Sequence, residues 1–233
     1  METIGLGKMI DKINNQTPKY LLLNSFASNP TKRNDYLSYR YHRTRKAERR
    51  EEIQALAGSV IGTTVALLSF AKKQKTNPFK INYGLMELIG VSAGAIIGGV
   101  AGGVIKADPF DKKRKVNEGI FQFANASIPP AVVLALETVT EKSKMFNTKL
   151  GKIATTVAGL AGGMFAAAKV SNFIADPGDF EKDRKLTMKD SLANIDDAIG
   201  VLAMSDFPVL QKIAGPTLPI IYALCGFRAG ESN

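Results

Sequence analysis

The chain has few of the residues from which common catalytic and metal sites are built. Its 233 residues include one cysteine (Cys225), one histidine (His42) and no tryptophan. A single cysteine cannot form an intramolecular disulfide, which argues against a small secreted domain held together by disulfides. A multi-histidine metal site or a Ser-His-Asp triad would have to be built on His42 alone, which lies in a basic run.

Short motifs for nucleotides and metals are lacking too. There is no phosphate-cradling loop of the Walker type, no GxGxxG between a strand and a helix, and no CxxC or HExxH. We therefore expect no enzyme activity, no cofactor and no metal. The first 20 residues lack the charged start and apolar run of a secretory signal, and their apolar residues share one helical face. We expect residues 1–29 to form an amphipathic extension.

Long apolar stretches dominate what is present. Six of them alternate with basic segments, at 53–71, 84–105, 119–139, 150–174, 191–205 and 207–227. Most approach the ~20 residues that a helix needs to cross the hydrocarbon core. The run "GVSAGAIIGGVAGGVI" has no polar face larger than a serine, whereas a helix on a soluble surface should have one. The pattern predicts an all-α polytopic membrane protein and makes a soluble helical bundle the less favoured alternative.

The chain also repeats itself with an offset of 68 residues. "ADPFD" at 107–111 returns as "ADPGD" at 175–179, and Gly94, Gly162 and Gly230 recur with the same spacing. We interpret a basic juxtamembrane segment at 30–52 and a membrane domain at 53–230. That domain would contain three helical hairpins, at 53–105, 119–174 and 188–227.

Each ADP motif is typical of a turn between two helices. Asp176 would cap a new helix, Pro177 would occupy its first position, and Asp179 would reach back to the free amides. Asp108, Pro109 and Asp111 would do the same in the first motif. A divalent-cation site made from these four carboxylates is a less favoured alternative, because two distant loops would have to converge.

Asp196 and Asp197 leave the number of crossings open. They stand where the earlier units have mostly apolar residues. An ionised carboxylate in mid-bilayer is costly and usually functional, so a polar path involving Asp196, Asp197, Lys169 and Glu87 is one hypothesis. We favour instead an amphipathic helix at 188–204 that lies in the interface, leaving five crossings rather than six. With six crossings, the N-terminus, both ADP loops and the C-terminus share one side.

The net charge of the chain is +10, and the distribution of the basic residues predicts which way that side faces. That side carries most of the 31 lysines and arginines, which predicts that it faces the cytoplasm or its equivalent. The run "RYHRTRKAERR" at 40–50 favours anchoring to anionic lipid over binding to nucleic acid, because an apolar segment follows it directly. We expect lipid headgroups or an acidic partner at Arg43, Arg45, Lys46, Arg49, Arg50, Lys112, Lys113, Arg114 and Lys115.

Small residues recur every four positions in three apolar stretches. Such stripes let helices approach closely in lipid, either within one chain or between copies. The stripes predict helix packing at Gly58, Gly62, Gly90, Gly94, Gly98, Gly102, Ala158, Gly162 and Ala166. The function we expect is a structural packing subunit of a larger membrane assembly, formed with copies of itself or other membrane proteins. A small channel or carrier is the first alternative, and a basic nucleic-acid-associated protein is the second.

Overall fold

A computed structural model describes residues 47–107, 109–140, 142, 148–178, 183–187, 190 and 208–232. These residues form α-helices joined by short connections, with no strand among them. The helices are α3 (Arg49–Gln74), α4 (Leu85–Val104), α5 (Pro109–Thr140), α6 (Lys149–Ala175) and α9 (Pro208–Glu231), and a 3₁₀ turn, η3, covers Pro78–Lys80. The all-α fold predicted from the sequence is confirmed. The stretch expected to be helical at 191–205, the extension at 1–29 and most of the basic segment lie outside the described residues.

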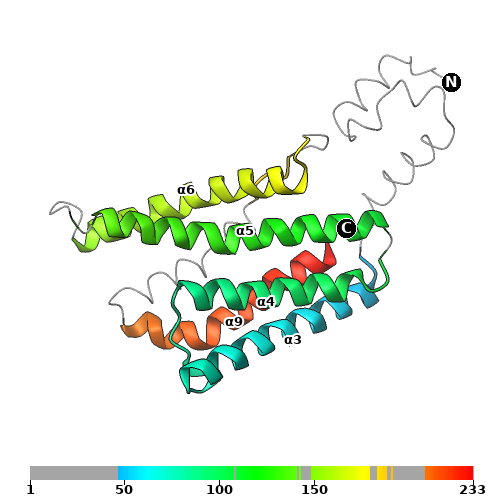
Figure 1. Ribbon diagram of the computed structural model, residues 1–233, viewed down its shortest axis with the longest axis horizontal. Helices are drawn as coiled ribbons and strands as arrows, with labels where there is room; N and C mark the ends of the chain where they lie inside the picture. The colour runs from blue at the N-terminus through cyan, green and yellow to red at the C-terminus, as the bar shows by residue number, and fades with distance from the viewer. Residues whose placement is uncertain are drawn as a thin grey trace, which may run out of the picture.

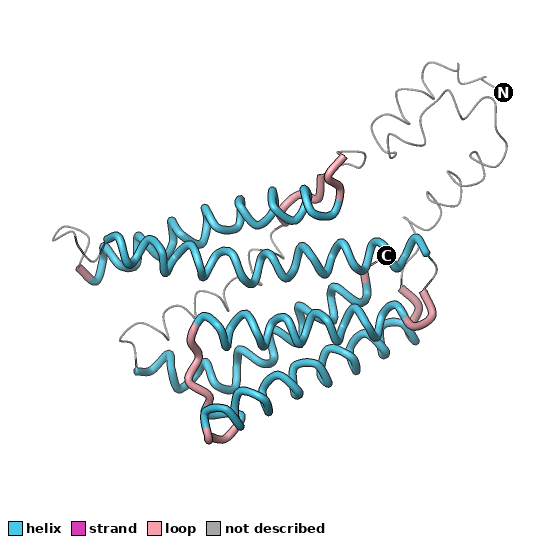
Figure 2. Tube along the Cα trace, viewed as in Figure 1, coloured by secondary structure: helices cyan, strands magenta, loops and turns pink. Residues whose placement is uncertain are grey.

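The helices are arranged as two hairpins with α9 packed beside the first (Figure 1). α3 pairs with α4, and α5 pairs with α6. α9 contacts α3 and α4, while α4 and α9 together form the surface on which α5 lies. α6 packs mainly against α5 and therefore lies at the margin of the bundle (Figure 2). The triple repeat inferred from the sequence stays a prediction.

The helix directions define two ends of the bundle. α9 runs parallel to α4, because Gly226 lies against Ala95 and Gly230 against Gly99. The ends of α4, α6 and α9 therefore gather where α3 and α5 begin, which we call the ADP end. Residues 75–84, which join α3 to α4, lie at the opposite end, which we call the lysine end (Figure 1).

Several helix boundaries follow from local capping. The amide of Glu48 donates to the Glu51 carboxylate at 3.4 Å, so charged residues begin α3 and it starts before the expected apolar stretch. Lys75 ends the same helix with a left-handed φ of 52°, and its amide bonds to the last carbonyls. At α4, the Glu87 carboxylate accepts the amide of Gly84 at 3.2 Å.

The two ADP motifs lead into different local structures. α5 begins at Pro109, the position that the first motif predicts. In the second motif Asp176 is the C-cap of α6, and Pro177 and Gly178 form a turn instead of a helical first turn. The expected helix start at Pro177 is therefore wrong. The physical difference is Gly178 in place of Phe110, since glycine costs about 1 kcal/mol in a helix.

Four helices, α3, α4, α5 and α6, are long and apolar enough to cross a membrane, with mean hydropathies of 1.4 to 1.7. The protein itself covers little of α3 and α6: only 22% of the α3 window and 28% of the α6 window are buried. Large apolar side chains such as Ile61, Val65, Val157 and Phe165 point outward. The described helices fit an integral membrane protein.

Glycines bring the helices of the first hairpin into backbone contact. A Cβ on Gly58 would strike the carbonyl of Gly98, and a Cβ on Gly62 would strike that of Gly94. The neighbouring glycines of α4, Gly99 and Gly103, face α9 in the same way. α4 therefore packs between two helices through two adjacent small-residue faces.

Candidate functional site: a buried charged cluster at the ADP end

Polar residues form a buried stripe along the first half of α5. They are Asp111, Lys115, Glu118, Gln122 and Asn125, and the steps between them alternate between four and three residues. This spacing places all five on one helix face. Four of the side chains belong to residues that are at most 2% exposed, and Glu118 is half-buried. The helix thus carries a polar seam into the interior of an otherwise apolar bundle.

Arg184 joins this stripe to the segment that follows α6. Its Nε and Nη2 donate to the two carboxylate oxygens of Glu118 at 2.6 and 2.7 Å. Its Nη1 and Nη2 donate to the two carboxylate oxygens of Asp190 at 3.0 Å each. The guanidinium also stacks over the ring of Phe121, 3.4 Å from its centroid. Bidentate hydrogen bonding combined with flat stacking on a ring suits the planar guanidinium of arginine better than the ammonium group of lysine.

Asp190 is the most completely bonded carboxylate of the cluster. Thr187 donates to it through its backbone amide at 2.8 Å and its hydroxyl at 2.7 Å, and Arg228 of α9 donates at 3.0 Å. Burial by itself raises the pKa of Asp190. The bonds from Arg184 and Thr187, with the guanidinium charge, outweigh burial and lower the pKa to about 2. Asp190 is therefore ionised at every physiological pH.

A second ion pair ties α5 to α3. The Nζ of Lys115 lies 3.9 Å from the Glu51 carboxylate and donates to the carbonyl of Ser232, after α9, at 3.3 Å. Lys115 is fully buried. The expectation that Lys115 contacts lipid headgroups or an acidic partner outside the chain is corrected by this burial, because its acidic partner is Glu51.

The charges of these contacts cancel. Arg184 and Arg228 face Glu118 and Asp190, and Lys115 faces Glu51. These ion pairs hold α3, α5, α9 and the residues around Arg184 together. In the described part of the chain, no group of three or more histidine, cysteine or acidic residues could hold a metal. Of the four ADP carboxylates, Asp111 is buried next to Arg114 and Asp176 caps α6, while Asp108 and Asp179 lie outside the described residues.

The other residues predicted to contact headgroups differ in their exposure, and three of them lie outside the described residues. Arg49, Arg50, Lys112 and Lys113 are exposed at the ADP end, and Arg114 is half-buried. Arg43, Arg45 and Lys46 lie outside the described residues. The exposed cations form a surface that could face anionic headgroups.

Two residues of the predicted polar path, Glu87 and Lys169, are described, and they lie toward opposite ends of the bundle. Glu87 lies at the lysine end, where it also accepts a bond from Gln74 at 3.2 Å. Lys169 is exposed on α6, toward the ADP end. Asp196 and Asp197 lie outside the described residues.

The predicted packing residues fall into two groups. Gly58, Gly62, Gly94, Gly98 and Gly102 lie in the contact between α3 and α4, and Gly90 faces the Phe70 ring. The small-residue stripe of α6 is largely exposed instead of packed against another described helix. Ala158 and Gly162 are exposed, Ala166 is half-buried, and a Cβ on Gly162 would meet nothing within 4 Å.

The charged cluster itself was missed by sequence reasoning. Glu51, Glu118, Gln122, Asn125, Arg184, Asp190 and Arg228 were not among the candidates. The alternating spacing on α5 was a usable signal, because polar residues on one face of a helix that is apolar enough to cross a membrane usually face the interior of the bundle. The partners Arg184, Asp190 and Arg228 carry no such local signal, since only the tertiary fold brings them to α5.

Comparison with protein families, curated proteins and solved structures finds no match to this chain. Its geometry and chemistry therefore carry the functional argument.

Proposed function

We propose that this protein is a non-enzymatic integral membrane protein that acts as a packing subunit of a larger membrane assembly. The observation that carries this proposal is the uncovered outer face of α6. One face of that helix packs on α5 through Gly159 and Gly163, which lie against Val133 and Pro129. Among the described residues, no helix covers the neighbouring face, on which Ala158 and Gly162 are exposed and Ala166 is half-buried.

The contact between α3 and α4 supports this role. There, small-residue stripes of the same spacing bring two helices of one chain into backbone contact. A second helix could approach the outer face of α6 equally closely and gain dispersion contacts that lipid tails do not provide. The occupant would be a helix of another copy or of another membrane subunit.

The charged cluster supports a structural role as well. Its carboxylates and guanidinium groups bond one another, so they fix Arg184, Asp190 and α9 against α5. In this proposal the ADP end, with Arg49, Arg50 and Lys112 exposed, faces the cytoplasm or its equivalent and contacts anionic lipid.

Association in vesicles tests the proposal. Energy transfer between separately labelled copies should report self-association of the wild-type chain, and Gly162→Leu should weaken that association by tenfold or more. Ala161→Leu is the matched control, because Ala161 is exposed on the same helix about 100° away. A wild-type chain that stays monomeric at every protein-to-lipid ratio, and copurifies with no other membrane protein, would contradict the proposal.

A second candidate, a small channel or carrier, is favoured by one observation, the buried stripe on α5. Gln122 and Asn125 lie well inside the helix, beyond the bonded charges. Polar groups inside a spanning helix often mark a path for ions or substrates. Ion flux in proteoliposomes that is abolished by Gln122→Leu and Asn125→Leu, or by Asp196→Ala and Asp197→Ala, would favour this candidate over the packing subunit.

A further inference from the structure

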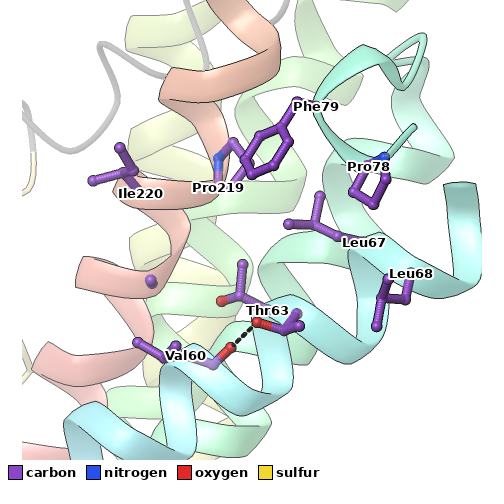
Figure 3. A pocket seen from close by; sticks show the side chains of 10 residues that line it. Val60, Thr63, Leu67, Leu68, Pro78, Phe79, Pro219 and Ile220 are labelled. Atoms are coloured by element: carbon purple, nitrogen blue, oxygen red, sulfur yellow. Dashed lines mark hydrogen bonds between the residues drawn. The ribbon is translucent and has the colours of Figure 1, made fainter.

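An apolar groove of about 430 Å³ lies between α3 and α9. Val60, Leu67 and Leu68 line it from α3, and Pro219, Ile220 and Ala223 line it from α9. Pro78 and Phe79 of η3 bound it at the lysine end (Figure 3). The groove therefore runs along α3 and α9 and ends at the connection between α3 and α4.

The groove offers almost no hydrogen-bonding capacity to an occupant. Its two hydroxyl groups already donate within α3: Thr63 to the carbonyl of Ser59 at 2.8 Å, and Thr64 to that of Val60 at 2.7 Å. The other lining side chains are apolar. A hydrocarbon chain fits this chemistry, whereas a polar ligand would lose its bonds to water without replacement.

Lysines stand where the groove ends. Lys72 follows Val60, Thr64 and Leu68 in steps of four residues, so it continues their line on α3 one turn beyond Leu68, about 6 Å further along the axis. Lys73 lies in the last turn of α3, and Lys75 and Lys80 lie in the connection to α4. All four lysines are exposed. Glu87 is the only carboxylate between residues 53 and 107, and it is bonded to Gln74 and Gly84.

We propose that the groove between α3 and α9 binds one acyl chain of an anionic phospholipid, whose phosphate contacts Lys72 and its neighbouring lysines. The proposal rests on the insertion of α3 into a membrane, which belongs to the proposed function. The apolar groove matches the acyl chain of such a lipid, and the lysines at the end of the groove match its phosphate. The acyl chain of a zwitterionic lipid would fit the groove equally well, but its neutral headgroup would be attracted less strongly to the lysines.

A basic residue near a membrane surface attracts anionic lipid with a free energy of about 1 kcal/mol. Each lysine should therefore raise the local concentration of anionic lipid about fivefold. The groove should therefore select anionic lipid from a neutral bilayer by at least this factor.

A single introduced tryptophan can measure this selection, because the chain has none. Phe79→Trp places the reporter in the groove, and Ile97→Trp places a control on α4, where Ile97 is 69% exposed and no lysine or arginine lies between residues 81 and 105. The protein is reconstituted in phosphatidylcholine with increasing fractions of phosphatidylglycerol that carries bromine on its acyl chains. Bromine quenches tryptophan that it contacts.

We expect half-maximal quenching of the groove reporter at about a fivefold lower phosphatidylglycerol fraction than that of the control reporter. Lys72→Gln should remove most of this difference, while Lys106→Gln, at the ADP end, should preserve it. Thr64→Phe should fill the groove and reduce quenching, while Val65→Phe, on the same helix but outside the groove, should not.

Equal quenching of both reporters would overturn the proposal and leave membrane insertion intact. A groove reporter that is protected while the control is quenched would also overturn it, and would indicate that a protein helix covers the groove. If neither reporter is quenched, the chain does not sit in the bilayer, and the proposed function fails with it. Circular dichroism and gel filtration of each variant identify any that fail to fold.

Discussion

At the scale of single residues, Arg184 joins most of the buried charge at the ADP end. It bonds Glu118 of α5 and Asp190 at once, and Arg228 of α9 reaches the same Asp190. Burial by itself lowers the pKa of Arg184, but its bonds to Asp190 and Glu118 outweigh burial and raise it. Because each charge has its partner, removing one of them leaves others buried and uncompensated.

The first prediction concerns Arg184→Gln. Loss of the guanidinium leaves Glu118 and Asp190 without their strongest partner, so we expect the free energy of unfolding to fall by about 3 kcal/mol. Unfolding in detergent followed by circular dichroism measures this fall. Lys185→Gln is the control, because Lys185 is exposed and next in sequence, and it should change stability by less than about 0.5 kcal/mol. Equal stability of the two variants would contradict the role of the cluster.

The second prediction concerns pH. The pKa of Asp190 is lowered from 3.8 to about 2, so its contribution to stability is present above pH 3.8 and is lost as pH falls toward 2. This loss should amount to about 2 kcal/mol. The difference in stability between the wild-type chain and Asp190→Asn should therefore shrink between pH 4 and pH 2. A difference that stays constant over this range would show that Asp190 is not held ionised by its partners.

At the scale of elements, the two hairpins use small residues differently. α3 and α4 bury theirs against each other, whereas α6 uses Gly159 and Gly163 for its contact with α5 and leaves Gly162 open. The outer face of α6 could not be told from its inner face by sequence, because both carry glycine and alanine at the same spacing. Only the position of α5 decides which face is covered.

The third prediction compares two glycines. Gly98→Ala would place a Cβ against the carbonyl of Gly58, so the helices must separate, at a cost of about 1 to 3 kcal/mol. Gly162→Ala meets open space and should leave the free energy of unfolding unchanged or slightly raised. Denaturation of both variants under the same conditions checks this. A Gly98→Ala variant as stable as Gly162→Ala would mean that α3 and α4 do not touch as described.

How much could be predicted from the sequence differs between elements and sites. The apolar stretches predicted the helical class and all five α-helices of the described residues, because length and hydropathy are local properties. The start of α5 at Pro109 followed from its capping motif, while the turn at Pro177 did not, since Gly178 weakens the helix there. Lys115 looked like a surface cation because it ends the basic run Lys112–Lys115. Its burial depends on Glu51, which lies 64 positions earlier and meets it only in the fold.

At the scale of the whole molecule, the described helices place the start of α3 and the end of α9 at the same end of the bundle. Lys115 near the start of α5 bonds both Glu51 and the carbonyl of Ser232, which joins these ends directly. Whether the chain crosses a membrane five or six times stays a prediction, because residues 191–207 lie outside the described part of the chain.

The fourth prediction is the resulting topology. Cys225 is buried, and Cys225→Ala provides a background for single cysteines at exposed sites. Ser232→Cys and Arg49→Cys should react with a membrane-impermeant maleimide from one side of sealed vesicles, and Lys75→Cys and Lys142→Cys from the other. Labelling of Ser232→Cys and Arg49→Cys from opposite sides would contradict the shared ADP end.

The central claim is that lipid surrounds the outward apolar faces of the helices, and spin-label accessibility tests it most directly. Labels at Val65 and Val157, which are 58% and 61% exposed, are compared in vesicles with a label at Lys75. We expect the labels at Val65 and Val157 to collide with oxygen, which dissolves in hydrocarbon, and to be shielded from a water-soluble nickel chelate that reaches Lys75. Free access of the nickel chelate to Val65 and Val157 would contradict the claim.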